Sequence, residues 1–128
     1  MQKLLIKIND LISNSPAKYD KIIYFSLLLA LLSNIIIWLM ILIVFWNFKE
    51  YIILGYNVYF GISSFGVWYK LLLLPLLGLL IILINNLLAF QIYLEYSILA
   101  KFLSVMTVVI NFILIIFISL IIYLNLYY

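Results

Sequence analysis

The sequence predicts an all-α integral membrane protein with three transmembrane helices in a small bundle, an N-terminal amphipathic helix on the bilayer surface and an ordered outward loop between the first two spans. Of 128 residues, 70% are hydrophobic and 9% are charged, with a mean hydropathy of +1.38. Soluble domains are roughly half apolar and a quarter charged. The apolar residues also form runs long enough to cross a bilayer, so we expect residues 1–128 to be a single membrane domain.

The segment 1–15 is predicted to form a short amphipathic helix in the bilayer interface. Apolar side chains recur at helical spacing, and lysines lie off that stripe, where they would face anionic headgroups. The apolar positions are Leu4, Leu5, Ile8, Leu11 and Ile12. Pro16 ends the helix because it lacks a backbone donor. A secretory signal peptide is the competing interpretation, but the next apolar run exceeds an h-region of about 7 to 15 residues and no A-x-A-like site follows.

Three apolar stretches are predicted to span the membrane, and they cover residues 22–46, 71–93 and 98–123. The first contains 25 residues without a charge, whereas about 20 suffice to cross about 30 Å of hydrocarbon. Residues 94–97 are predicted to form a tight turn. The second and third spans should therefore form an antiparallel helical hairpin.

The lysines predict the orientation, because positively charged loops stay cytoplasmic. All seven basic residues are lysines. Four of them precede the first span and Lys101 flanks the second turn, whereas Lys49 and Lys70 lie in the loop between the first two spans. We therefore expect a cytoplasmic N-terminus, with both residues 47–70 and the C-terminus outside.

Each span carries one face of small or polar residues, which predicts how the helices pack. The polar side chains expected to bond between helices are those of Asn34, Asn85, Ser104, Thr107 and Asn111. Helices in lipid turn such side chains inward, where each interhelical hydrogen bond contributes about 0.6 to 2 kcal/mol. A structural role is the favoured hypothesis. The alternative is a polar cluster around a solute or ion, but no carboxylate or lysine accompanies the asparagines in mid-membrane.

The connector, residues 47–70, holds three of the four glycines and many aromatic residues. Glycines favour turns, and β-branched and aromatic residues favour extended backbone, so we expect a small hairpin or a folded loop on the outer face. Its candidate interaction residues are Tyr56, Asn57, Tyr59, Phe60, Gly61, Gly66 and Trp68. They form either a docking surface for a protein or peptide, or a structural plug at headgroup depth. The plug is favoured because interfacial aromatic residues need no ligand.

The run Y-N-V-Y-F-G-I at residues 56–62, with the L-P-L-L-G-L run at 74–79 and Ile84-Asn85, is the most specific pattern in the chain. It resembles an uncharacterised family of small three-span bacterial membrane proteins. More remotely, the connector is similar to the unknown-function module of SdpI-type immunity proteins, which protect membranes against toxic peptides. Gly55 and Ser63 stand where the small family has His and Asp, so no imidazole or carboxylate role is expected there. The resemblance implies a bacterial plasma membrane and three spans.

The composition argues against most chemistry. The chain has no histidine and no cysteine, and its four carboxylates are scattered, so we expect no enzyme, no metal and no cofactor. The lysines are dispersed along the sequence, so we expect no basic patch that would bind nucleic acid. The leading hypothesis is a non-catalytic accessory or structural component that associates laterally with other membrane proteins or with itself. The alternatives are an immunity or sensing protein that recognises a membrane-active peptide through the connector, and a subunit of a transporter or channel.

Overall fold

The computed structural model describes residues 1–14, 16–47 and 51–127, without the side chains of Leu11 and Lys18. In chain order its elements are α1 (Gln2–Asn14), a 3-10 helix (Pro16–Tyr19), α2 (Lys21–Phe45), β1 (Ile52–Asn57), β2 (Gly61–Gly66), a second 3-10 helix (Trp68–Leu72), α3 (Leu73–Ile92) and α4 (Ser97–Tyr127). Three predicted features lie outside the described residues: the end of the first helix at Ser15, the location of Lys49 outside the membrane, and the last residue, Tyr128.

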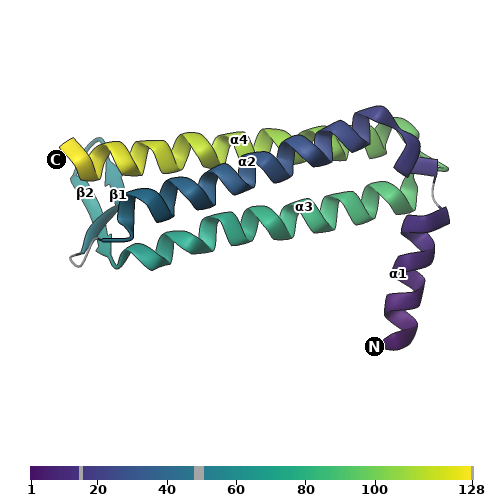
Figure 1. The fold of residues 1–128 in the computed structure, drawn as a ribbon. Helices are drawn as coiled ribbons and strands as arrows, with labels where there is room; N and C mark the ends of the chain where they lie inside the picture. Colours follow the sequence, from purple (N-terminus) through teal and green to yellow (C-terminus); the bar gives the residue numbers. More distant parts are fainter. Residues whose placement is uncertain (15, 48–50, 128) are drawn as a thin grey trace.

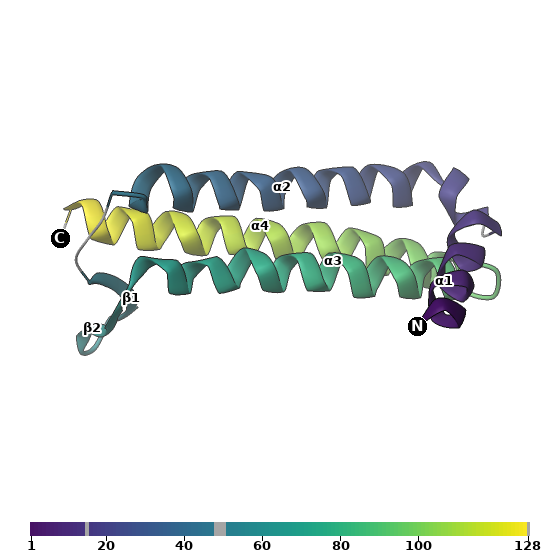
Figure 2. The same cartoon turned by 60° about the horizontal axis from the view of Figure 1, so that its bottom comes forward.

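Helices α2, α3 and α4 run side by side along most of the molecule (Figures 1 and 2). α2 and α4 point the same way, and α3 runs in the opposite direction (Figure 1). In the described part of the chain, three helices are long and apolar enough to cross a membrane. A helix of 25 residues such as α2 is about 37 Å long, enough for a bilayer core of about 30 Å. These helices indicate a membrane-embedded protein.

The helix boundaries differ from the sequence prediction most at the C-terminus. α2 and α3 begin and end within two residues of the predicted spans, and the first turn of α3 accommodates Pro75, whose missing N–H costs no helical bond there. α4 continues to Tyr127, four residues beyond the predicted end at residue 123. The physical reason is that Asn125, in this extra turn, bonds both its own helix and β1.

The bundle has an apolar cluster at each end. The cluster next to the β-strands contains Phe45, Ile41, Ile118, Ile121 and Ile52. The cluster next to α1 is built from smaller residues, Ala17, Ala89 and Ala100, together with Ile23. Small side chains let helix backbones approach closely, so the helices at the α1 end are packed through smaller side chains than those at the end next to the β-strands.

α1 points away from the end of the bundle instead of continuing along the long helices (Figures 1 and 2). Its outer residues Leu4, Leu5 and Ile6 are exposed. Asp20 begins the next helix as an N-cap, because its Oδ1 accepts hydrogen bonds from the backbone N–H groups of Ile22 and Ile23 at 2.9 and 3.4 Å. The interfacial position of α1 remains a prediction.

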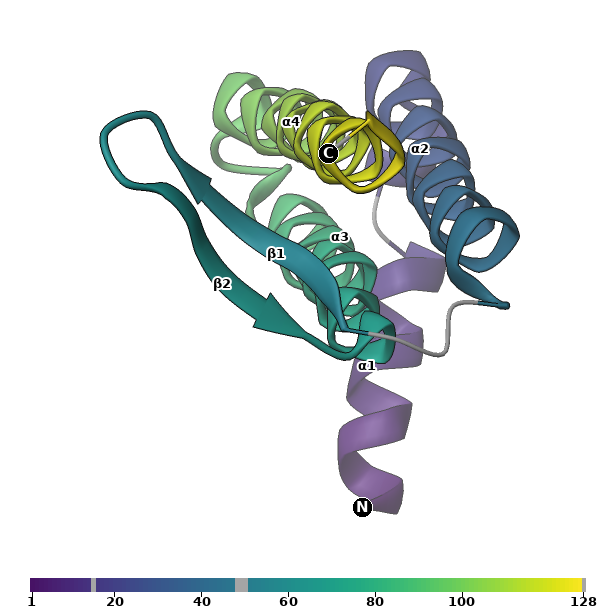
Figure 3. The same ribbon diagram turned by 90° about the vertical axis from the view of Figure 1, so that its left-hand side faces the viewer.

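The connector folds as an antiparallel hairpin of β1 and β2 at the opposite end of the bundle (Figure 3). The chain is 79% helical, and this hairpin is its departure from an all-α fold. Gly61 has a φ of 76° and closes the turn after residues 58–60, a conformation that favours glycine. The Oδ1 of Asn57 accepts a hydrogen bond from the Tyr59 N–H at 2.9 Å and so supports the same turn.

Candidate functional site

The middle of the bundle is joined by the side-chain amide of Asn34. Its Nδ2 donates to the carbonyl of Pro75 at 2.9 Å and to the Oδ1 of Asn111 at 3.2 Å. Its Oδ1 accepts a hydrogen bond from the Nε1 of Trp38 at 3.1 Å. One buried amide therefore links α2 to both α3 and α4.

Gly78 leaves the space that this amide occupies. A Cβ at Gly78 would lie 2.6 Å from the Nδ2 of Asn34 and 3.0 Å from the Oδ1 of Asn111. Both distances are too short for an unstrained contact, so a side chain here would push the two asparagines apart. The small residue in α3 is needed because polar groups from two other helices meet against it.

A second polar contact joins α3 to α4. The Nδ2 of Asn85 donates to the Oγ1 of Thr107 at 3.0 Å, and the same hydroxyl donates to the Leu103 carbonyl at 2.9 Å. The Nδ2 of Asn111 donates to the Thr107 carbonyl at 3.0 Å. The structure thus brings Asn34 to Asn111 and Asn85 to Thr107, all four of which the sequence had selected.

The polar contacts of Ser104 and Asn86 differ from those that the sequence predicts. Ser104 is fully buried, but its hydroxyl has no hydrogen-bond partner among the described residues. The sequence predicts an interhelical contact for Asn85, but the neighbouring Asn86 is the more deeply buried of the two. Its Nδ2 donates to the Ile82 carbonyl at 2.8 Å, while its Oδ1 has no hydrogen-bond partner within the part of the chain that the structure describes. Spacing within one helix could not tell which neighbour would face inward.

At the α1 end of the bundle, the long helices are joined through charged side chains instead of amides. The Oδ2 of Asp20 accepts a hydrogen bond from the Tyr93 hydroxyl at 2.7 Å and lies 3.4 Å from the Nζ of Lys101. This cluster joins the starts of α2 and α4 to the end of α3. The sequence contained one signal for it, an aspartate immediately before an apolar helix, which is typical of an N-cap.

The environment of Asp20 also changes two pKa values. Burial raises the pKa of Asp20, but the hydrogen bonds from Tyr93 and from the backbone at Ile22 and Ile23, with the nearby Lys101, outweigh it, so the net pKa lies below 3.8. The pKa of Tyr93 is raised, chiefly because its hydroxyl donates to Asp20. The cluster therefore keeps an ionised carboxylate and a neutral phenol near neutral pH.

Asn125 holds the hairpin to the bundle. Its Oδ1 accepts a hydrogen bond from the Ile53 N–H at 2.7 Å, and its Nδ2 donates to the Ile53 carbonyl at 2.9 Å. The same Nδ2 donates to the Ile121 carbonyl at 2.8 Å. The amide thus pairs with β1 as a neighbouring strand would. No local pattern in the sequence indicates this role for Asn125, because its partner lies 72 residues away.

The tip of the hairpin is the most exposed apolar part of the candidate interaction surface. Val58, Tyr59 and Phe60 are 86%, 90% and 87% exposed. In the end-on view the hairpin crosses the end of the bundle and its tip reaches past α4 (Figure 3). Of the other residues selected there, Tyr56 and Asn57 are exposed, Gly61 and Trp68 are half-buried and Gly66 is buried.

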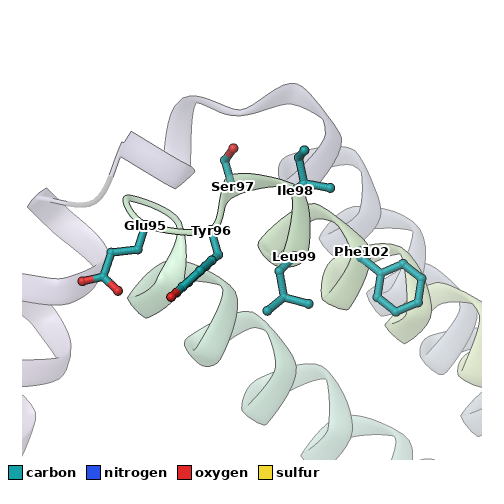
Figure 4. A pocket seen from close by; sticks show the side chains of 6 residues that line it. All are labelled: Glu95, Tyr96, Ser97, Ile98, Leu99 and Phe102. Carbon is teal, nitrogen blue, oxygen red and sulfur yellow. The ribbon is translucent and has the colours of Figure 1, made fainter.

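Two cavities lie near the ends of the bundle. One, of about 380 Å³, lies between β1 and α4 and is lined by Leu54, Tyr56, Phe117 and Leu120, among others. The other, of about 480 Å³, lies at the α3–α4 turn, and the side chains that line it spread to both sides of the turn instead of converging (Figure 4). Neither arrangement gathers catalytic groups, and the described residues contain no cluster of three or more potential metal ligands from His, Cys, Asp and Glu.

Together, the fold and these contacts define the class as a small helical bundle with the apolar spans of a membrane-embedded protein. No family model, no curated protein and no solved structure matches the chain. The resemblance of the connector to the small bacterial family and to SdpI-type proteins therefore stays a prediction.

Proposed function

We propose that this chain is a non-catalytic integral membrane protein of the bacterial plasma membrane that associates laterally with other membrane proteins or with itself. The observation that carries the proposal is the hairpin tip, where Val58, Tyr59 and Phe60 are almost fully exposed. Residues 51–69 contain no charged side chain. An exposed apolar patch on an ordered element is typical of an interaction surface.

The way the hairpin is held supports the same proposal. An isolated two-stranded hairpin is marginally stable, but here Asn125 makes two hydrogen bonds to the Ile53 backbone. The side chain of Ile52 is also buried in the apolar cluster at this end of the bundle. The hairpin is therefore held in one position before a partner binds, which lowers the entropic cost of binding.

Photo-crosslinking from the tip tests this proposal. A crosslinking residue at Tyr59, irradiated in native membranes, should form a reproducible adduct with a membrane protein, identified by mass spectrometry. The matched control is the same residue at Tyr24, which is exposed on α2 away from the hairpin. The Asn125→Leu variant should reduce the Tyr59 adduct because it releases β1. Equal adducts from both positions, or none from Tyr59, would contradict a role for the tip.

Recognition of a membrane-active peptide is the second candidate. In the described residues β2 pairs only with β1, so its outer edge can accept a further strand. A Tyr56→Ala, Tyr59→Ala double variant should then insert normally but lose protection against such a peptide in a survival assay. A double variant that protects as well as the parent chain would exclude this candidate.

The transporter alternative has less support. The mid-bundle asparagines Asn34, Asn85 and Asn111 bond to one another's helices, as expected for structural contacts. Replacing each singly with Leu should leave solute flux across liposomes unchanged. Loss of flux would support a transport role instead.

The proposed orientation places the N-terminus in the cytoplasm and the hairpin outside. The chain has no cysteine of its own, so a single cysteine at the exposed Ser63 reports the location of β2. An impermeant thiol reagent should label it from outside intact cells. Labelling only after the cells are opened would reverse the topology.

A further inference from the structure

The two edges of the β-hairpin differ in what covers them. At the edge of β1, Asn125 of α4 bonds to both backbone groups of Ile53, the N–H and the carbonyl. β1 also contacts α4, whereas β2 packs chiefly against β1. In the end-on view β2 lies on the outer side of the hairpin, away from α4 (Figure 3). Among the described residues, the outer edge of β2 is therefore the open edge of the sheet.

The contacts of Ile53 show which backbone groups point to that open edge. Ile53 lies directly opposite Phe65 in the antiparallel ladder. Opposite residues either exchange both of their backbone hydrogen bonds or turn both pairs of groups away from each other. Because Ile53 turns its N–H and carbonyl toward Asn125, Phe65 turns its own N–H and carbonyl to the far edge of β2. One residue thus presents a donor and an acceptor side by side, away from β1.

The β2 edge lacks the features that usually keep strand edges from pairing. Natural edges are often protected by lysine or proline, or are covered by another element. β2 contains no charged residue and no proline, and residues 62–65 are all exposed. The register shifts of the hairpin lie around Gly55, on the tip side of the Ile53–Phe65 pair. The strand can therefore accept a further strand beside Phe65.

The direction of β2 restricts which strand can reach it. Both strands are seen along their length when the helices are viewed end-on, so they run across the helix axes (Figure 3). With α2, α3 and α4 across the bilayer, β2 lies along the membrane plane. Two copies inserted in the same direction are related by a two-fold axis along the bilayer normal. A half-turn about this axis reverses the direction of β2, so two β2 strands meet as antiparallel neighbours at the same depth.

We propose that the outer edge of β2 is a self-association surface, at which the β2 strands of two copies pair antiparallel across this two-fold axis. The Phe65 N–H and carbonyl of each copy then join the shared ladder, and the two hairpins form one four-stranded sheet. A two-stranded hairpin is marginally stable by itself, and further strands stabilise it. This inference rests on the lateral association proposed above and names the surface and the partner.

An extended peptide could use the same backbone groups, but the charges favour a second copy. Amphipathic membrane-active peptides are typically rich in lysine and arginine. Residues 51–69 contain no carboxylate that would attract such a peptide, whereas a second β2 is equally uncharged. The Phe65 side chain is exposed. In the shared sheet the two Phe65 rings lie on the same face, where cross-strand aromatic contacts are stabilising.

Thiol crosslinking in defined vesicles tests the dimer. The chain has no native cysteine. Ser64→Cys places a thiol in the exposed stretch of β2, and Val58→Cys is the matched control at the exposed tip, away from the proposed axis. In purified protein at high lipid excess, a short bifunctional thiol reagent should link the first variant into dimers at least about tenfold faster, because paired edges hold the thiols at a high effective concentration. Equal rates would overturn the proposal.

The backbone of Phe65 is tested in the Ser64→Cys background. Proline lacks the N–H, and at this position the N–H faces the new strand instead of β1. Phe65→Pro should therefore slow dimer formation by about tenfold, since each dimer loses a hydrogen bond from both copies. Phe65→Ala keeps the N–H and controls for the lost ring, so it should slow dimer formation by less than about threefold. Equal effects of the two variants would overturn the proposal.

Amide hydrogen exchange gives a second measurement, which needs no substitution. The Phe65 N–H should exchange more slowly as the protein-to-lipid ratio is raised, because more of the chain is then dimeric. The Gly66 N–H is the control, since Gly66 pairs with Ile52 inside the hairpin and its exchange should not change. A Phe65 amide whose exchange does not depend on the ratio would overturn the proposal.

These results are separable from those of the proposed function. A chain that stays monomeric in vesicles but forms a heterologous adduct at Tyr59 in native membranes refutes the dimer and keeps the lateral association with other proteins. A monomer whose Phe65 N–H is protected only after a lysine-rich amphipathic peptide is added assigns the edge to such peptides and also refutes the dimer. A monomer without any adduct refutes both the dimer and the lateral association.

Discussion

The middle of the bundle and its α1 end both join all three long helices through polar side chains, but with different groups. In the middle, Asn34 bonds to Pro75 and Asn111, and each of these groups is neutral. At the end, Asp20 meets Tyr93 and Lys101. A neutral amide can be buried in hydrocarbon when its hydrogen bonds are made, whereas a charge is tolerated where water and a counter-charge are near.

The two regions should therefore respond to different solution conditions. The Lys101 side chain is 36% exposed, so its attraction to Asp20 is screened by salt and contributes little by itself. The amide contacts have no ionisable group and are buried. We therefore expect the end to respond to pH and the middle to respond mainly to changes in shape and hydrogen bonding.

The largest effect is expected from Gly78→Leu. A side chain at this position meets Asn34 and Asn111 at contact distances that are too short, so it should separate α3 from the other helices. We expect the free energy of unfolding in bicelles to fall by about 2 to 3 kcal/mol. The control is Leu77→Ala on the exposed face of α3. Similar losses from both variants would mean that the Gly78 contact is not special.

Asn34→Leu should have the next largest effect. It removes the bonds to Pro75 and Asn111 and leaves the Trp38 N–H without its acceptor. We expect a loss of about 1 to 2 kcal/mol in the same unfolding measurement. This loss should not vary with pH. Ser119→Ala is the control, since Ser119 is exposed and its hydroxyl donates to the Ile115 carbonyl of the same helix. A pH-dependent loss at Asn34 would break the distinction between the two regions.

Asp20→Ala should cost about 1 kcal/mol, because it removes an N-cap. The folded pKa of Asp20 lies below the ordinary value of 3.8. Its charge therefore stabilises the fold above that value, and the contribution is lost as the pH falls through the lowered pKa. Acid titration of thermal unfolding should show this loss. Asp20→Asn keeps a capping side chain but has no carboxylate, so its thermal stability should fall less at acid pH than that of the parent chain. An equal fall in both proteins would exclude Asp20 as the source of the acid loss.

Tyr93→Phe should have the smallest effect. It removes one hydrogen bond to Asp20 and leaves the N-cap in place. The pKa of Asp20 should rise toward its ordinary value, which moves the acid midpoint upward with little change in stability at neutral pH. Carboxyl NMR of Asp20 measures the shift directly. An acid midpoint equal to that of the parent chain would show that the Tyr93 bond does not stabilise the carboxylate.

The sequence by itself determined the features that depend on local composition. Long uncharged apolar runs predict the helices α2, α3 and α4, the break at residues 94–97 predicts the turn between the last two, and the glycines and aromatic residues of the connector allow a hairpin. The small and polar faces also indicated that Asn34, Asn111 and Thr107 would be used between helices. These inferences need only the period of a helix and the solvent preference of each side chain.

Only the tertiary structure decided which polar groups meet. Asp20 and Tyr93 are 73 residues apart, and Asn125 and Ile53 are 72 apart, so no local pattern links them. Asn86 instead of Asn85 is the more buried neighbour because α2, α3 and α4 pack together at particular rotations about their axes. Helix period gives the faces of each helix but not the rotation at which three faces fit. That rotation follows from close packing around small residues such as Gly78.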